Sequence, residues 1–122
     1  MATNICAYCA ISREDAWISN ELAVAVPHPQ PLVRFHSLIV PTRHVMAFYD
    51  LDVQEQHAIW AIIGEIQKKL AGEMPLLGVD IGFQDGTSEQ DHAQVHVVPR
   101  TAGRTLQLPQ DVEWVYSEAG SV

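Results

Sequence analysis

The stretch Asp91-His92-Ala93-Gln94-Val95-His96-Val97-Val98-Pro99-Arg100 decides the fold that this sequence predicts. Successive side chains of an extended strand point to opposite faces of a sheet, so this stretch has two different faces. The polar face carries His92, Gln94 and His96, and the apolar face carries Ala93, Val95 and Val97. We expect the apolar face to pack on a core, while the polar face must meet water, a ligand or a metal ion. Pro99 is expected to close the strand, because proline cannot donate to a ladder.

The rest of the chain predicts an antiparallel sheet covered by one long helix. A hairpin is expected over Trp17–Pro27, with Leu22–Val26 as its second strand, and further strands at His36–Val40 and Gly78–Gln84. Asp52 and Glu55 form a capping box that opens a helix running to about Ala71. This helix has an apolar stripe made of Ile59, Ile62, Ile63, Ile66 and Leu70. Hairpins with one covering helix predict an α+β fold.

Length and charge set limits on the partners. The chain has 122 residues, which predicts a single domain over 1–122, with a core of about 1–104 and a tail at 105–122. Its net charge of −8, from 7 basic and 15 acidic side chains, argues against nucleic acid or an anionic membrane as the main partner. No apolar run reaches a transmembrane length and no signal peptide is recognisable, so we expect a cytoplasmic protein. Trp114 and Tyr116 suggest that the tail docks, on this chain or on a partner subunit.

Two segments resemble the histidine triad (HIT) family. His92–Val98 resembles its signature, in which three histidines alternate with apolar residues. Phe35–His44 looks like the family's G-H-x-L-V-I-P-x-x-H strand, and the resemblance spans roughly the first hundred residues. It implies a HIT-like fold, with an antiparallel sheet and one long helix, assembled as a homodimer. The chain departs from the signature at its middle histidine, which is Gln94 here.

The two cysteines, Cys6 and Cys9, form a C-x-x-C motif. Such a motif is compatible with two buried, inert thiols or with half of a tetrahedral zinc site. In zinc-containing members of the family, the other ligands are the histidine that ends the I-P-x-x-H strand and the first histidine of the triad. The resemblance therefore implies a closed, structural zinc site made of Cys6, Cys9, His44 and His92.

The family's enzymes hydrolyse or transfer nucleoside monophosphates, and their middle histidine attacks the α-phosphorus. Imidazole suits this step, because it is a neutral nucleophile near pH 7 and then a good leaving group. The Gln94 amide is not nucleophilic, although it can still donate a hydrogen bond to a phosphate oxygen. We assign the catalytic positions to Gln94 and His96. His96 could contact phosphate, or it could be a structural histidine.

The resemblance also implies a set of nucleotide-binding residues: His28, His36, Gln84, Ser88, Gln94 and His96. His28 stands where the family usually has the aspartate that holds the ribose hydroxyls, and a solvated loop residue is the alternative for it. Ser88 stands where the family usually has a glutamine. Together with Gln94, His28 and Ser88 make three departures from the family pattern around one pocket. These departures favour binding or altered chemistry over the family's catalysis.

Three functions follow as hypotheses. The first is a nucleotide hydrolase or transferase that acts on the α-phosphate of nucleoside phosphoramidates or dinucleoside polyphosphates, impaired by Gln94. The second is a non-catalytic module that binds a purine nucleotide or a related nucleoside phosphate. The third is a zinc-stabilised structural or interaction protein that has kept the fold and lost the pocket.

Overall fold

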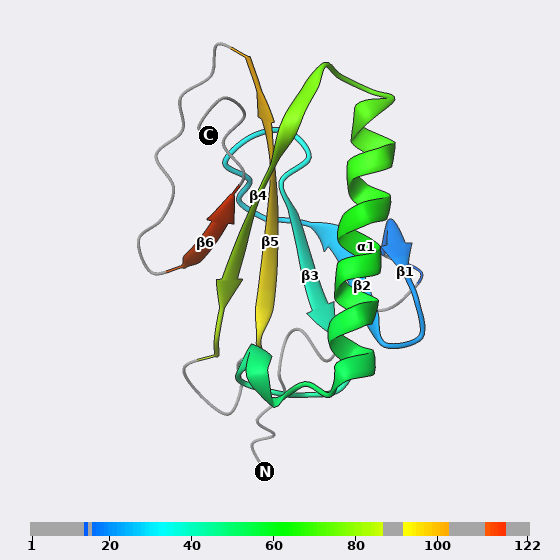
Figure 1. Ribbon diagram of the computed structural model, residues 1–122, viewed down its shortest axis with the longest axis vertical. Helices are drawn as coiled ribbons and strands as arrows, with labels where there is room; N and C mark the ends of the chain where they lie inside the picture. Colours follow the sequence, from blue (N-terminus) through cyan, green and yellow to red (C-terminus); the bar gives the residue numbers. More distant parts are fainter. Residues whose placement is uncertain (1–13, 15, 87–91, 103–111, 117–122) are drawn as a thin grey trace.

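The computed structural model describes residues 14, 16–86, 92–102 and 112–116. They form one antiparallel six-stranded sheet with a long helix against one of its faces (Figure 1). The strands are β1 (Ile18–Ser19), β2 (Ala23–Pro27), β3 (Ser37–Pro41), β4 (Leu76–Gln84), β5 (Gln94–Thr101) and β6 (Glu113–Tyr116). The helices are η1 (Phe48–Asp50), which is a single 3-10 turn, and α1 (Val53–Ala71). The predicted α+β fold with one long helix is therefore confirmed.

The strand β5 lies in the interior of the sheet, whose order is β1-β2-β3-β5-β4-β6. It pairs with β3 on one side and with β4 on the other. Val95 and Val97 belong to the main core together with the apolar stripe of α1, as the alternating pattern predicted. The five stripe residues are all buried. The face of β5 that carries Gln94 and His96 consequently points away from the helix.

The quoted stretch differs from its prediction at both ends. The strand begins at Gln94, so His92 lies just before it, and it continues through Pro99 to Thr101. Pro99 pairs with Val79 of β4, whereas the pairing with β3 ends at Val97. At Pro99, the edge of β5 that faces β3 therefore has no neighbouring strand to pair with. The N–H group that proline lacks would have made no ladder hydrogen bond on this edge, so its absence costs little free energy. The expectation that Pro99 closes the strand was wrong for this reason.

The helix α1 starts with the predicted capping box. The Asp52 carboxylate accepts from the Glu55 backbone amide at 2.8 Å, and the Glu55 carboxylate accepts from the Asp52 amide at 3.0 Å. Glu55 also accepts two hydrogen bonds from the Arg43 guanidinium, which lowers the pKa of the buried Glu55 carboxyl. Arg43 lies two residues after the last residue of β3, so this bidentate pair joins the end of β3 to the start of the helix.

The residue before β3 has an unusual backbone conformation. Phe35 is the single non-glycine residue with a positive φ, 70°, in the described part of the chain. The family pattern has glycine here, and glycine adopts a positive φ without the penalty that a Cβ brings. The Phe35 ring stacks on Trp17 at 6.2 Å and lies under the Arg34 guanidinium. These contacts offset the cost of the conformation, which aims His36 at the interior.

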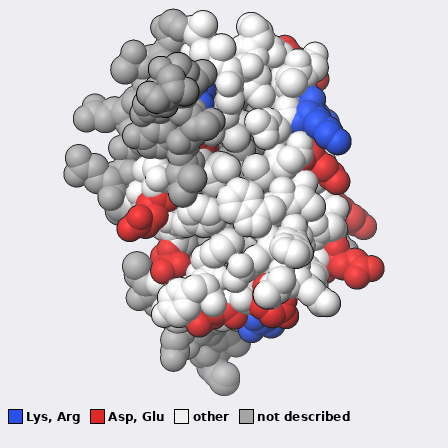
Figure 2. Space-filling view, in the orientation of Figure 1, with Lys and Arg blue, Asp and Glu red and all other residues white. Residues whose placement is uncertain are grey.

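The segment expected to form the tail contributes β6, which pairs with the outer edge of β4 over Asp80–Phe83 (Figure 1). The part of the tail that the structure describes, residues 112–116, therefore docks on its own chain. No helix among the described residues is long and apolar enough to span a membrane. On the face shown in Figure 2, acidic groups lie mainly along the margin and the centre is uncharged.

Candidate functional site: a chain of histidines behind the sheet

The candidate site lies on the face of the sheet opposite α1. Sheet register places His96 beside Gly82 and Gln94 beside Gln84, so both polar residues of β5 face the same side as their β4 partners. Gln94 is 8% exposed and His96 is 6% exposed. Two buried polar side chains in one row must satisfy their hydrogen bonds within the protein or through a ligand.

The first link of this row is His36, which is buried just before β3. The Leu32 backbone amide donates to His36 Nδ1 at 3.1 Å, so the ring proton of neutral His36 is on Nε2. His36 Nε2 lies 3.1 Å from His96 Nδ1. We therefore assign His36 as the donor and His96 Nδ1 as the acceptor of this bond.

The same argument assigns the tautomer of His96. Because its Nδ1 accepts from His36, neutral His96 carries its proton on Nε2. That nitrogen lies 2.8 Å from Gln84 Oε1, which accepts. One backbone amide thus orders a chain of three hydrogen bonds, from Leu32 through His36 and His96 to Gln84. The sequence motifs predicted the side chains of His36, His96 and Gln84. They did not indicate Leu32, because it acts through its backbone amide.

His28 joins this cluster from the loop after β2. Its ring stacks on His36 at 4.3 Å between centroids and lies 5.4 Å from the ring of His96. The Gln30 amide donates to His28 Nδ1 at 3.0 Å, which again leaves the proton on Nε2. His28 is therefore a partly buried member of the cluster and not a solvated loop residue.

Burial disfavours the charged forms of His36 and His28. Burial lowers the pKa of His36 to about 4, and the repulsion that His28 and His96 exert on a further positive charge adds to the effect. Burial also lowers the pKa of His28. Neutral imidazoles keep one donor and one acceptor each, so the hydrogen-bond chain persists at pH 7.

The three histidines lie close enough to hold a metal ion, since one ligand atom from each falls within 4.8 Å of the others. A metal needs a lone pair from each ring. In His28 and His36 the Nδ1 lone pairs already accept backbone amides, and the Nε2 atoms carry hydrogens. Metal binding would require these amide bonds to break. As folded, the cluster therefore does not present three lone pairs to one ion.

His92 and His44, the two histidines assigned to zinc, lie near each other at another place. Their ring centroids are 5.0 Å apart, edge to face. His92 is fully buried, and its Nε2 lies 3.0 Å from the carbonyl oxygens of Pro41 and Arg43. Carbonyls only accept, so Nε2 carries the proton and Nδ1 has the lone pair. Zinc-binding histidines typically donate their second nitrogen to a carbonyl in this way.

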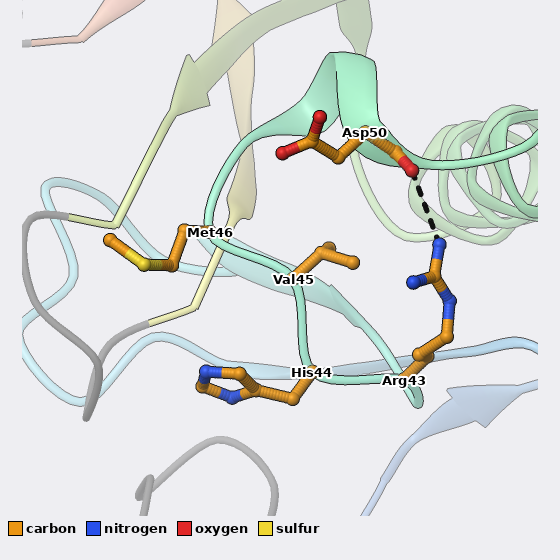
Figure 3. Close-up of a pocket in the computed structure, with 5 residues that line it drawn as sticks. All are labelled: Arg43, His44, Val45, Met46 and Asp50. Atoms are coloured by element: carbon orange, nitrogen blue, oxygen red, sulfur yellow. Dashed lines mark hydrogen bonds between the residues drawn. The ribbon is translucent and has the colours of Figure 1, made fainter.

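His44 is exposed and lines an open hollow of about 590 Å³ with Arg43, Val45, Met46 and Asp50 (Figure 3). Its ring projects away from the Arg43 guanidinium, which donates to the Asp50 carbonyl at 3.2 Å. Cys6, Cys9 and Ser88 lie outside the described residues.

A model of the HIT domain matches residues 12–103 of this chain. The chain belongs to the HIT domain family. The bifunctional bis(5'-adenosyl)-triphosphatase/adenylylsulfatase FHIT of Arabidopsis thaliana is 26% identical to this HIT domain protein over 96 residues, covering 76% of the chain and 53% of that relative. The bis(5'-adenosyl)-triphosphatase of Dictyostelium discoideum is 25% identical over 93 residues, covering 74% and 62%. The chain thus spans about half to two thirds of their lengths.

Solved structures show the same fold. A Zn-bound histidine triad family protein from Mycobacterium smegmatis superimposes with a TM-score of 0.72 at 24% identity, over 87% of this chain and 82% of that one. A hypothetical protein from Leishmania major gives a TM-score of 0.69 at 19% identity, over 95% and 85%. At these identities the likeness establishes the HIT fold and no particular activity.

The neutral state of His36 predicts a pH dependence of stability. With a pKa of about 4 in the folded chain and an ordinary value near 6.5 in the unfolded chain, only the unfolded chain takes up this proton between those values. The free energy of unfolding should therefore fall as pH drops from 7 to 4. His36→Gln should remove up to about 3 kcal/mol of that fall. Urea denaturation of both chains at pH 7 and at pH 4 measures this fall in the free energy of unfolding.

The control is His57→Gln, at an exposed position of α1, which should leave the pH dependence unchanged. Equal pH dependence of stability in the wild-type chain and in His36→Gln would contradict the assignment of a neutral, buried His36.

Proposed function

We propose that this HIT domain protein binds a purine nucleotide or a related nucleoside phosphate, with the phosphate beside His28, His36 and His96. Gln84, Gln94 and Ser88 complete the proposed nucleotide site. The observation that carries the proposal is the buried row of His36, His96 and Gln84, which the ordered hydrogen-bond chain holds in place, with the His28 ring stacked against it. The imidazole N–H groups of this row can donate to the oxygens of a phosphate when a ligand replaces their present partners. The similarity to the Arabidopsis and Dictyostelium relatives, both bis(5'-adenosyl)-triphosphatases, supports this ligand class.

We further propose that covalent catalysis is impaired. In the family reaction a histidine at the position of Gln94 forms a bond to the α-phosphorus while the leaving group departs with its electron pair. Gln94 offers no nucleophilic nitrogen. His96 does not replace it, because its Nδ1 lone pair accepts from His36 and its Nε2 carries a proton. To donate to a phosphate oxygen or to the leaving group, His96 has to exchange its hydrogen bond to Gln84 Oε1 for one to the ligand.

The decisive variant is Gln94→His. If the pocket is otherwise competent, this change should raise hydrolysis of adenosine phosphoramidate or a diadenosine polyphosphate by at least about a hundredfold, because it restores the nucleophile. A trapped nucleotidyl-histidine should then appear by mass spectrometry. Gln94→Asn, which keeps an amide, is the matched control and should remain inactive.

Two outcomes would change this view. A wild-type chain that already turns over as fast as Gln94→His would overturn the proposed role of Gln94. A Gln94→His chain that binds nucleotide without turnover would favour the alternative, a non-catalytic nucleotide-binding module.

We also propose a structural zinc ion held by Cys6, Cys9, His44 and His92. The proximity of His44 to His92 and the carbonyl partners of His92 Nε2 support two of these four ligands. Such an ion would tie the N-terminal segment to the turn after β3 and would take no part in the reaction. A zinc-stabilised structural or interaction protein is the function that remains if no nucleotide binds.

Elemental analysis of protein purified without chelator should find about one zinc per chain. His44→Ala and Cys6→Ser should each lose it, whereas His57→Ala should retain it. Removing the metal should lower the free energy of unfolding by several kcal/mol, since the site forms only in the folded chain. Metal-free protein with unchanged stability in Cys6→Ser would reject the site.

We propose that the whole chain, residues 1–122, is one domain with a core of about 1–104, and that it forms a homodimer. Large apolar side chains are exposed: Tyr49, Val53, Trp60 and Leu77 are 80%, 65%, 45% and 53% exposed. Apolar surface of this kind is commonly covered by a second subunit.

Light scattering at micromolar concentration should give the mass of a dimer. Trp60→Lys should shift it towards the monomer, because a charge would enter the apolar contact. Ala61→Lys adds the same charge at the next, exposed position of α1 and should leave the dimer intact. A wild-type monomer would refute the assembly.

A further inference from the structure

His28 differs from the other two histidines of the cluster in how its ring N–H group is used. Nε2–H of His36 points to His96 Nδ1 at 3.1 Å, and Nε2–H of His96 points to Gln84 Oε1 at 2.8 Å. Nε2–H of His28 makes no hydrogen bond to the part of the chain that the structure describes. His28 is also only partly buried. Its N–H group can therefore bind a ligand without first giving up a partner among the described residues.

His28 can donate a hydrogen bond to a ligand but cannot accept one. Its single lone pair, on Nδ1, accepts from the Gln30 amide at 3.0 Å. Burial lowers the pKa of His28, which favours this neutral form with one donor and one occupied acceptor. A carboxylate in this place would accept from both hydroxyl groups of a ribose, whereas His28 accepts from neither.

The position of His28 suits the sugar end of a bound nucleotide. Its ring stacks on the buried His36 at 4.3 Å between centroids and lies 5.4 Å from the ring of His96. His28 thus borders the proposed phosphate position on its more exposed side. In a nucleotide the sugar directly follows the 5'-phosphate, and the family pattern has its ribose-binding residue at this same place. The part of the ligand that reaches His28 is therefore the sugar, or a group that the sugar carries.

The charge of the surrounding chain favours an anion at this place. Residues 22–49 include two arginines and three histidines but no aspartate or glutamate, although the whole chain has 15 acidic side chains and a net charge of −8. This segment supplies β2, the loop that carries His28, and β3. Asp80, on the same face of the sheet as Gln84, is paired with Arg100 at 3.8 Å. A negative charge added beside His28 meets no like charge from residues 22–49.

We propose that His28 makes the site selective for a nucleotide whose sugar carries a second phosphate, on its 2' or 3' oxygen, over a nucleotide with a free 2',3'-diol. This inference rests on the proposed nucleotide function and adds the residue that recognises the sugar end of the ligand. An ionised phosphate oxygen accepts the N–H group of His28, and a hydrogen bond to a charged group is stronger than one to a hydroxyl. A free diol would find no acceptor on His28 for either of its hydrogens.

A second explanation needs only structure: the His28 ring could serve merely to shield His36 from water. His28→Phe separates the two roles, because phenylalanine keeps a flat ring that can stack on His36 and lacks the N–H donor. A shielding role predicts that this variant changes the affinities for all nucleotides equally, or changes none.

The test is calorimetric titration of the full chain with AMP, ADP and the 2',5'- and 3',5'-bisphosphates of adenosine. The wild-type chain should bind one of the bisphosphates about tenfold more tightly than AMP, the effect expected from one hydrogen bond to a charged group. His28→Phe should abolish this preference. It should also lower the affinity for that bisphosphate more than the affinity for ADP, which has as many phosphates but a free diol.

His28→Asp should reverse the preference, because a carboxylate repels a sugar phosphate and accepts from a diol. The matched control is His57→Phe, which makes the same change at an exposed position of α1 and should keep the wild-type preference. Equal affinities of the wild-type chain for AMP and both bisphosphates, or equal losses for bisphosphate and ADP in His28→Phe, would overturn the role of His28. A wild-type chain that binds none of the four nucleotides would instead overturn the proposed function, and the sugar selectivity with it.

Discussion

The constraint on which this structure depends is the burial of β5 on both of its faces. The strand is paired along both edges, and its residues from Gln94 to Pro99 are all buried. Its apolar face is stabilised simply by removal from water under α1. Its polar face has no such gain, and each buried polar atom there needs a partner. The chain of hydrogen bonds from Leu32 to Gln84 meets that need for His36 and His96.

The way in which this need is met limits the chemistry of the site. The backbone amides of Leu32 and Gln30 each take one Nδ1 lone pair, and the ring protons are therefore placed on Nε2 of His36 and His28. The cluster is therefore poorly suited to a metal, which needs the lone pairs that these amides occupy. The backbone thus decides which chemistry three histidines can perform.

The turn after β3 connects three parts of the molecule. The carbonyls of Pro41 and Arg43 accept from His92, and the Arg43 side chain holds Glu55 at the start of α1. The Val45 carbonyl accepts from the Ala93 amide at 2.7 Å, which aligns the entry of β5. The position of α1, the entry of β5 and the His44–His92 pair are consequently coupled. A change in this turn would disturb the sheet, the helix start and the proposed zinc ligands together.

The sequence by itself determined the elements whose formation rests on local patterns. The alternation of His92–Val97 gave the two faces of the central strand, the spacing from Ile59 to Leu70 gave the buried side of α1, and Asp52 with Glu55 gave its first residue. The residues His28, His36, Gln84, Gln94 and His96 were also chosen from motifs, because side-chain type is written directly in the sequence.

Tertiary structure alone decided the features that depend on residues distant in the chain. Pro99 continues a strand because β3 has already ended beside it. Phe35 adopts a positive φ where the family pattern has glycine, and its ring is held by Trp17. The tautomers of the histidines follow from backbone amides in a loop, and the place of Trp114 follows from the absence of a side chain at Gly82 on another strand. Local pattern cannot encode such contacts, because each one depends on which strand becomes the neighbour of which.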